Sequence, residues 1–435
     1  MSGSNKSEIA TSDLMKQFVM PNYGRFAIEL VRGEGSWVED VKGGRYLDFA
    51  TGIAVCSLGH CHSVIQQALR EQGEKLIHCS NLYQIREQAL LARHLVEKVM
   101  GAAGKVFFCN SGAEANDTLI KLARKYGNHL SKPGGRYEII TCEGSFHGRT
   151  LGGIAATGQD KVKAGFEPML EGFKHVPYND VEALENAVGD RTVAILIEVV
   201  QGEGGIHVVS EEFLQTALRL RDEHDLLLMF DEVQCGLGRT GDKRTWDAVI
   251  EQLEPDAVSW AKGLAGGFPM GAVWVRANRT TKNAAGDEEQ GQLCDALGPG
   301  SHGSTFGGTP LGSAVALAVL EEIEKERLWE NAAQLGGYIK QTLGEWGLDL
   351  IQSVRGRGLM LGFVFNVAKL EQNEAFKQSG QTPALFVVSR LMDKGLLTVP
   401  AGTDVVRWLP ALNVSQEDVD LALNKLKELL NELAE

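Results

Sequence analysis

The chain has 435 residues, of which 43% are hydrophobic, and a formal net charge of −14. This length predicts a globular protein of two or three domains at roughly 150 residues each, and the acidic balance argues against nucleic acid and anionic membranes as partners. No apolar run reaches the roughly 18–20 residues that cross a bilayer, and the first residues, MSGSNKSEIATSDL, lack the apolar core of a secretory signal. Seven cysteines without a C-x-x-C pair favour reduced thiols and a cytoplasmic location.

The first 275 residues carry the pattern of an α/β fold. SWVEDVKGGRYLDFA predicts a hairpin that turns at Gly43 and Gly44. Further along, helices are expected from Ala113 and over 211–224. They alternate with apolar runs, which predict strands at 105–109, 137–142, 193–200, 226–230, 256–260 and 271–275. Such alternation predicts a largely parallel sheet that is covered on both faces.

After residue 310 the pattern changes to a long helical stretch (310–345), several apolar strands and an amphipathic terminal helix. This favours a smaller α+β domain. We expect three parts, namely an N-terminal segment (1–70) that packs with the small domain, a large domain (71–325) and a C-terminal small domain (326–435). The polar, glycine-rich stretch 279–300 is expected to be a mobile loop.

Three segments suggest sites for anions and flat rings. In NSGAEAND (110–117), which follows a strand and opens a helix, the backbone and hydroxyl of Ser111, Gly112 and Ala113 could hold a phosphate; an ordinary helix cap is the alternative. The loop GSFHGRTLGG contains Phe146 and Arg149, which could instead be a core residue and a surface ion pair. GSHGSTFGGTP (300–310) is another loop that could contact an anion.

Two charged residues come directly after apolar strands. Asp231 ends the run LLLMFD, where a carboxylate at the end of a parallel strand either meets water or faces a bound ligand. Lys262 follows the strand 256–260, and such a lysine is either a surface charge or a Schiff-base nucleophile. The segment GHCH (59–62) is a poor metal site, because His60 and His62 lack carboxylate partners. We therefore expect no metal.

These features converge on one cofactor. Pyridoxal 5'-phosphate needs a lysine for its aldehyde, an anion site for its phosphate, a carboxylate for its pyridine nitrogen and a flat group against its ring. Lys262, the 111–113 segment, Asp231 and Phe146 are candidates for these four tasks. The position of Asp231 at the end of a buried strand would let its charge meet a pyridinium in a dry site.

The chain resembles the class III, fold-type I, pyridoxal-phosphate-dependent aminotransferases over nearly its whole length. The motifs FFCNSGAEAND, FHGRTLGG, IEVVQGEGG, FDEVQCGLGRTG, AKGLAGGFPMGA and GSHGSTFGGTP occur in the family's order. The members that it is most similar to act on N-acetylornithine. The resemblance implies a ping-pong transfer in arginine biosynthesis, through a Schiff base on Lys262, from N-acetylornithine to 2-oxoglutarate, which yields N-acetylglutamate 5-semialdehyde and glutamate.

The resemblance also implies residue roles. Lys262 would move the proton, Asp231 would pair with the pyridine nitrogen, and Thr305 would reach the phosphate from the neighbouring subunit of a homodimer. Arg149 would hold the carboxylate of acetylornithine, with Ser304 nearby. The other positions implied to bind the cofactor are Ser111, Gly112, Ala113, Phe146, Glu232, Val233 and Gln234.

Glu198 and Arg407 match a pair that explains dual specificity in related enzymes. The first substrate has no carboxylate on its reacting carbon, whereas glutamate has one. The resemblance implies that Glu198 neutralises Arg407 for the first substrate and releases it for the second. A plain interdomain salt bridge is the alternative.

Several other activities stay open at this point. Ornithine, succinylornithine, 4-aminobutyrate and acyl-diaminopimelate are donors of related enzymes. An aminomutase of the same fold would need no 2-oxoglutarate, and a non-catalytic pyridoxal-phosphate sensor is a third class.

Overall fold

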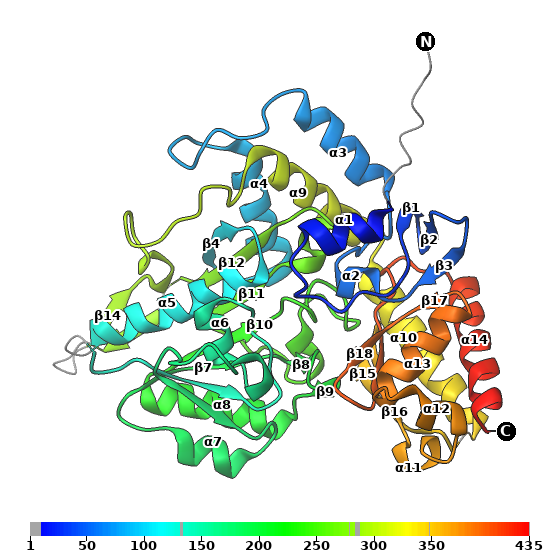
Figure 1. The fold of residues 1–435 in the computed structure, drawn as a ribbon. Coiled ribbons are helices and arrows are strands. Elements are labelled where there is room, and N and C mark those ends of the chain that lie inside the picture. The colour runs from blue at the N-terminus through cyan, green and yellow to red at the C-terminus, as the bar shows by residue number, and fades with distance from the viewer. Residues whose placement is uncertain (1–9, 131–133, 278, 283–287, 348, 435) are drawn as a thin grey trace.

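The computed structural model describes residues 10–130, 134–277, 279–282, 288–347 and 349–434 (Figure 1). Its centre is a seven-stranded sheet in the order β4-β12-β11-β10-β7-β5-β6. Strand β12 pairs antiparallel with β4 and β11, whereas the other neighbouring strands pair in parallel, which confirms the expected mostly parallel sheet. The strands are β4 (Gly104–Cys109), β5 (Glu138–Cys142), β6 (Phe173–Val176), β7 (Thr192–Ile197), β10 (Leu227–Asp231), β11 (Ala257–Trp260) and β12 (Gly271–Arg276).

Helices cover both faces of this sheet, because alternate strand residues point to opposite sides. Leu228 and Ile195 belong to the core cluster that includes helix α8 (Glu211–His224). Their neighbours Leu227 and Leu196 pack with helix α5 (Gly112–Leu130) on the other face. The remaining helices of this half are α3 (Ser63–Gly73), α4 (Arg86–His94), α6 (Leu151–Ala156), α7 (Val181–Ala187) and α9 (Pro310–Lys325).

Segments from both ends of the chain form the second lobe. Strand β17 from the C-terminal part pairs with β3 to extend an N-terminal sheet, and a second small sheet has the order β15-β16-β19-β18. These strands are β1 (Leu30–Glu34), β2 (Trp37–Asp40), β3 (Arg45–Asp48), β15 (Ile351–Arg357), β16 (Met360–Phe365), β17 (Leu396–Leu397), β18 (Val399–Ala401) and β19 (Val405–Trp408). The helices are α1 (Thr11–Phe18), α2 (Thr51–Ala54), α10 (Leu328–Trp346), α11 (Val367–Leu370), α12 (Glu374–Ser379), α13 (Pro383–Asp393) and α14 (Gln416–Ala434).

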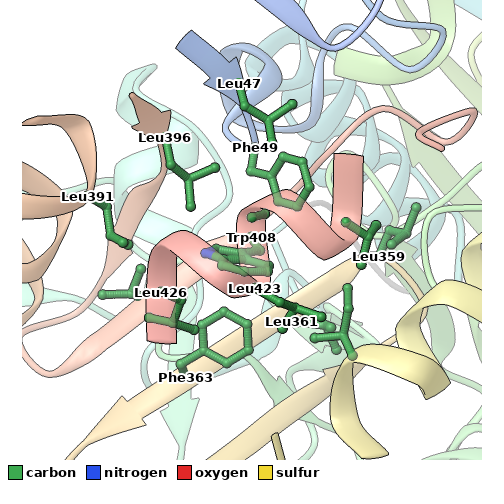
Figure 2. Close-up of a cluster of buried hydrophobic side chains, with 14 of the residues drawn as sticks. Leu47, Phe49, Leu359, Leu361, Phe363, Leu391, Leu396, Trp408, Leu423 and Leu426 are labelled. Carbon is green, nitrogen blue, oxygen red and sulfur yellow. The ribbon is translucent and has the colours of Figure 1, made fainter. Parts of the chain in front are cut away.

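One apolar cluster holds the two ends together. Figure 2 shows Leu47 and Phe49 from the N-terminal part packed around Trp408, which also meets Phe363 and Leu423. Phe49 and Phe363 each place a ring edge-on to Trp408, with centroids 5.1 and 4.7 Å away. Because Trp408 follows Arg407 directly, this packing fixes the strand that carries Arg407.

The stretch 279–300 differs from the expected loop. Its described residues include the paired strands β13 (Arg279–Lys282) and β14 (Glu288–Gly291), while residues 283–287 lie outside the described part. The two other short strands, β8 (Val200–Gln201) and β9 (His207–Val208), form a separate ribbon. Within the described ranges, none of the helices combines the length and apolarity that a bilayer crossing requires.

Candidate active site

A cavity of about 350 Å³ lies at the carboxyl ends of the central parallel strands. Ligands bind at this edge of open α/β sheets, since loops that leave neighbouring strands meet there. Among the residues expected from the sequence, those that line the cavity are Ser111, Gly112, Ala113, Phe146, Arg149, Glu198, Asp231, Val233, Gln234 and Lys262.

Asp231 ends β10 and is held by a set of hydrogen bonds. Its Oδ2 accepts from Asn116 Nδ2 at 2.6 Å and lies 2.8 Å from His147 Nδ1, while Oδ1 accepts from the Val233 N–H at 3.0 Å. Asn116 is fixed in turn, because its Oδ1 accepts from Ser259 Oγ at 2.7 Å. The carboxylate is 3% exposed and therefore has one orientation and little water.

The His147 imidazole supports the charge of Asp231. Burial by itself would lower the pKa of His147, but the hydrogen bond and charge of Asp231 outweigh burial and raise it. Its other nitrogen, Nε2, is buried without a hydrogen-bond partner among the described residues. His147 and Asn116 are functional positions that the sequence reasoning did not assign. Asn116 could have been found, because it lies four residues after Gly112 on the same helical face.

Lys262 follows β11 at the start of a short 3₁₀ turn and has a positive φ of 41°. Loss of hydration lowers the pKa of its amine, and the charge of Arg407 acts in the same direction. A lysine amine that loses its proton readily is a nucleophile and a base. The turn itself is held by Ser57, whose Oγ donates to the Gly263 carbonyl at 2.9 Å.

The N-terminus of α5 opens onto the same cavity. Ser111 caps the helix, since its Oγ accepts from the Glu114 N–H at 3.2 Å. The first N–H groups of a helix have no acceptor inside it, so those of Gly112 and Ala113 are available to an anion. Gly112 is required for a close approach, because a Cβ there would overlap the Val233 side chain.

Phe146 and Arg149 lie at the exposed side of the cavity. The Arg149 guanidinium stands 5.5 Å from the centroid of the Phe146 ring, a cation–π arrangement. In the described part of the chain Arg149 has no carboxylate partner, so it is free to bind one.

The structure corrects the expected Glu198–Arg407 pair. Arg407, on β19, is 1% exposed, and its Nη1 lies 2.7 Å from Glu203 Oε1 and 2.6 Å from Gln234 Oε1. Burial alone would raise the pKa of Glu203, but the charge and hydrogen bond of Arg407 lower it. Glu203 takes this place because it stands at the tip of the β8–β9 ribbon, whereas Glu198 stands at its base.

Glu198 faces the cavity from a different side. Its Oε2 accepts from the Phe146 N–H at 2.9 Å and its Oε1 from the Gly202 N–H at 3.5 Å. Burial raises the pKa of Glu198 to about 7, although the charge of His147 lowers it.

Besides Arg407, three expected residues do not line the cavity of this chain. Glu232 is buried and accepts from the Thr245 N–H at 2.8 Å and the Trp260 indole N–H at 3.3 Å, because side chains alternate along a strand and Asp231 takes the cavity side. Ser304 Oγ accepts from Asn110 Nδ2 at 3.0 Å. Thr305 is exposed, so a contact with phosphate would need another subunit.

The residues present fit pyridoxal phosphate. The cavity joins a fixed carboxylate at Asp231, an amine of lowered pKa at Lys262 and the start of α5, where the N–H groups of Gly112 and Ala113 are available to an anion. Pyridine nitrogen, aldehyde and phosphate are the three groups that these features complement.

Comparisons with known proteins agree with this assignment. The sequence pattern of the family described as aminotransferase class-III matches residues 18–430. The acetylornithine aminotransferase of Caldanaerobacter subterraneus subsp. tengcongensis is 43% identical over 420 residues, which are 96% of this chain and 98% of that protein.

Solved structures give the same picture. The acetylornithine aminotransferase of Elizabethkingia anophelis has a TM-score of 0.80 at 30% identity, covering 97% of this chain and 98% of that one. An ornithine aminotransferase of Toxoplasma gondii, with partial occupancy of PLP at its active site, has a TM-score of 0.85 at 30% identity, with 97% and 93% covered. The chain belongs to the class III aminotransferases.

Proposed function

We propose that this enzyme transfers the amino group of N-acetylornithine to 2-oxoglutarate with pyridoxal phosphate as cofactor, a step of arginine biosynthesis in the cytoplasm. The products are N-acetylglutamate 5-semialdehyde and glutamate. One observation carries the choice of substrates: Arg149 lines the cavity and has no carboxylate partner among the described residues, whereas Arg407 is paired with Glu203, which also lines the cavity. A donor with one distant carboxylate needs the first, and a dicarboxylic acid needs both.

Bound pyridoxal phosphate supplies an electron-poor ring that stabilises negative charge on the substrate carbon. Asp231, oriented by His147 and Asn116, would keep a proton on the ring nitrogen. The Lys262 amine would take the proton from the substrate carbon, since its lowered pKa makes it more readily available as a base. Ser111 and the N-terminus of α5 would hold the phosphate.

Arg407 selects between the two substrates. With N-acetylornithine, Glu203 neutralises the guanidinium, so no unpaired charge faces the apolar chain of the substrate. With glutamate, the α-carboxylate takes the place of Glu203 on Arg407, while Arg149 holds the distal carboxylate. Glu203 is 30% exposed and can swing away, whereas Arg407 is fixed in the core.

A homodimer with shared sites is part of the proposal. It is supported by the position of Thr305 outside the cavity of its own chain and by nearby apolar residues that face outward. Phe306 is 62% exposed, and Leu82 and Tyr83 are 86% and 69% exposed. Such a surface favours contact with a second protein chain.

Ornithine is the second candidate donor, because ornithine aminotransferases are among the solved structures of high similarity. Single-turnover spectra of the holoenzyme with N-acetylornithine, ornithine, succinylornithine and 4-aminobutyrate decide between them. We expect the fastest conversion with N-acetylornithine and regeneration by 2-oxoglutarate. Faster conversion with another donor reassigns the substrate, and turnover without any 2-oxo acid indicates an aminomutase.

A further inference from the structure

Because Glu203 is the partner of Arg407, Glu198 has no direct role in the selection between the two substrates. It directly follows β7, is 6% exposed and lines the cavity. Both of its carboxylate oxygens face backbone N–H groups, one from Phe146 and one from Gly202. A buried carboxyl group that accepts from two backbone N–H groups of different segments ties those segments together.

The two segments carry different parts of the site. Phe146 belongs to the loop after β5 and flanks the cavity, whereas Gly202 directly precedes Glu203. A second bond joins the same segments, since Gln201 Nε2 donates to the Glu143 carbonyl at 2.9 Å. Gly202 packs closely against Gln234, because a Cβ there would overlap the Gln234 side chain.

We propose that Glu198 is a positioning residue whose carboxylate couples the loop of Phe146 to the turn of Glu203, and so links cofactor retention to substrate selectivity. The selectivity half of this inference rests on the proposed function. Glu198 contacts the Phe146 loop on one side and the Glu203 turn on the other, so loss of its carboxylate should loosen both. A looser Glu203 masks Arg407 less well, which favours glutamate over N-acetylornithine.

Glutamine is the informative replacement, because it keeps the size of Glu198 but turns one acceptor into a donor. The side-chain N–H of the glutamine would then face a backbone N–H, which would lose its acceptor. A buried N–H without an acceptor destabilises the ordered position of its segment, by about tenfold in the equilibrium constant. Glu198→Gln should weaken pyridoxal phosphate binding to the apoenzyme about tenfold. It should also shift the ratio of the glutamate to the N-acetylornithine half-reaction about tenfold toward glutamate.

A double-mutant cycle with Glu203→Gln tests the coupling. Glu203→Gln alone should shift the ratio of the half-reactions toward glutamate. It should leave the affinity for pyridoxal phosphate within about twofold of the wild-type value. The double variant should keep the cofactor defect of Glu198→Gln and show no further shift of the ratio. Glu182→Gln, on an exposed part of α7, is the matched control and should change neither quantity.

Two results overturn the inference: normal cofactor affinity in Glu198→Gln, or shifts of the ratio that add in the double variant. If Glu198→Gln folds poorly by circular dichroism, Glu198→Asp replaces it in the cycle. Aspartate keeps both acceptors at a greater distance, so its shifts should be smaller and in the same directions, and their absence equally refutes coupling. A wild-type enzyme that ignores N-acetylornithine refutes only the proposed substrate, because the cofactor titration still decides whether Glu198 positions Phe146.

Discussion

Arg407→Ala is expected to damage the glutamate half-reaction far more than the N-acetylornithine half-reaction. The Arg407 guanidinium is 1% exposed and holds Glu203 at 2.7 Å, so a substrate carboxylate in that place would form the same charge-assisted contact. Loss of one partner of such a buried pair costs about 2–5 kcal/mol. At about 1.4 kcal/mol per tenfold, kcat/KM for glutamate should fall by roughly 30- to 4,000-fold.

The N-acetylornithine half-reaction should lose less than about tenfold, because the reacting carbon of this substrate bears no carboxylate for Arg407 to bind. Stopped-flow spectra of each half-reaction give the two values of kcat/KM separately. Arg407→Lys is the control: it keeps the charge but cannot reproduce the two-pronged contact of a guanidinium, so its defect should be intermediate.

Equal losses in both half-reactions for Arg407→Ala would refute the proposal that Arg407 selects between the two substrates. They would indicate that Arg407 serves as an interdomain ion pair that stabilises the whole site. A change in melting temperature with intact selectivity would point to the same conclusion.

Three other predictions follow from the contacts. His147→Phe should weaken pyridoxal phosphate binding about tenfold by removing a donor to Asp231; unchanged affinity in a fluorescence titration would exclude this support. Burial raises the pKa of Glu232 to about 7, above its unfolded value, so the folded protein binds more protons than the unfolded chain between pH 4.5 and 7. The free energy of unfolding should therefore fall by up to about 3 kcal/mol as the pH rises through this window. Glu232→Gln should flatten this pH dependence, and an unchanged slope in denaturant titrations would contradict the assignment. Phe306→Asp should convert the proposed dimer into monomers, measured by analytical ultracentrifugation, and these monomers should have little aminotransferase activity. An active monomer would rule out shared sites.

Much of the fold follows from local patterns in the sequence. Buried parallel strands are continuous apolar runs, so β7, β10 and β11 were predicted within a few residues. Strand β6 (Phe173–Val176) was missed, because FKHV carries a lysine and a histidine at the edge of the sheet. The boundaries expected near residues 70 and 325 stay a prediction.

The site was predictable where one residue follows one strand, as for Asp231 and Lys262. The partner of Arg407 was not predictable in this way, because Glu198 and Glu203 lie five residues apart in one glycine-rich segment. Only the turn of the β8–β9 ribbon decides which acid meets Arg407, and that turn depends on tertiary contacts. The placement of Glu232 away from the cavity lining agrees with the alternation of side chains, which puts it opposite Asp231.

A crystal structure of the enzyme with pyridoxal phosphate tests the central claim most directly. The account predicts the ring nitrogen within hydrogen-bond distance, about 2.7–2.9 Å, of Asp231, a covalent bond from Lys262 Nζ to the aldehyde carbon, and the phosphate at the N-terminus of α5. A ring bound with its nitrogen away from Asp231, or a covalent bond to a different lysine, would contradict it.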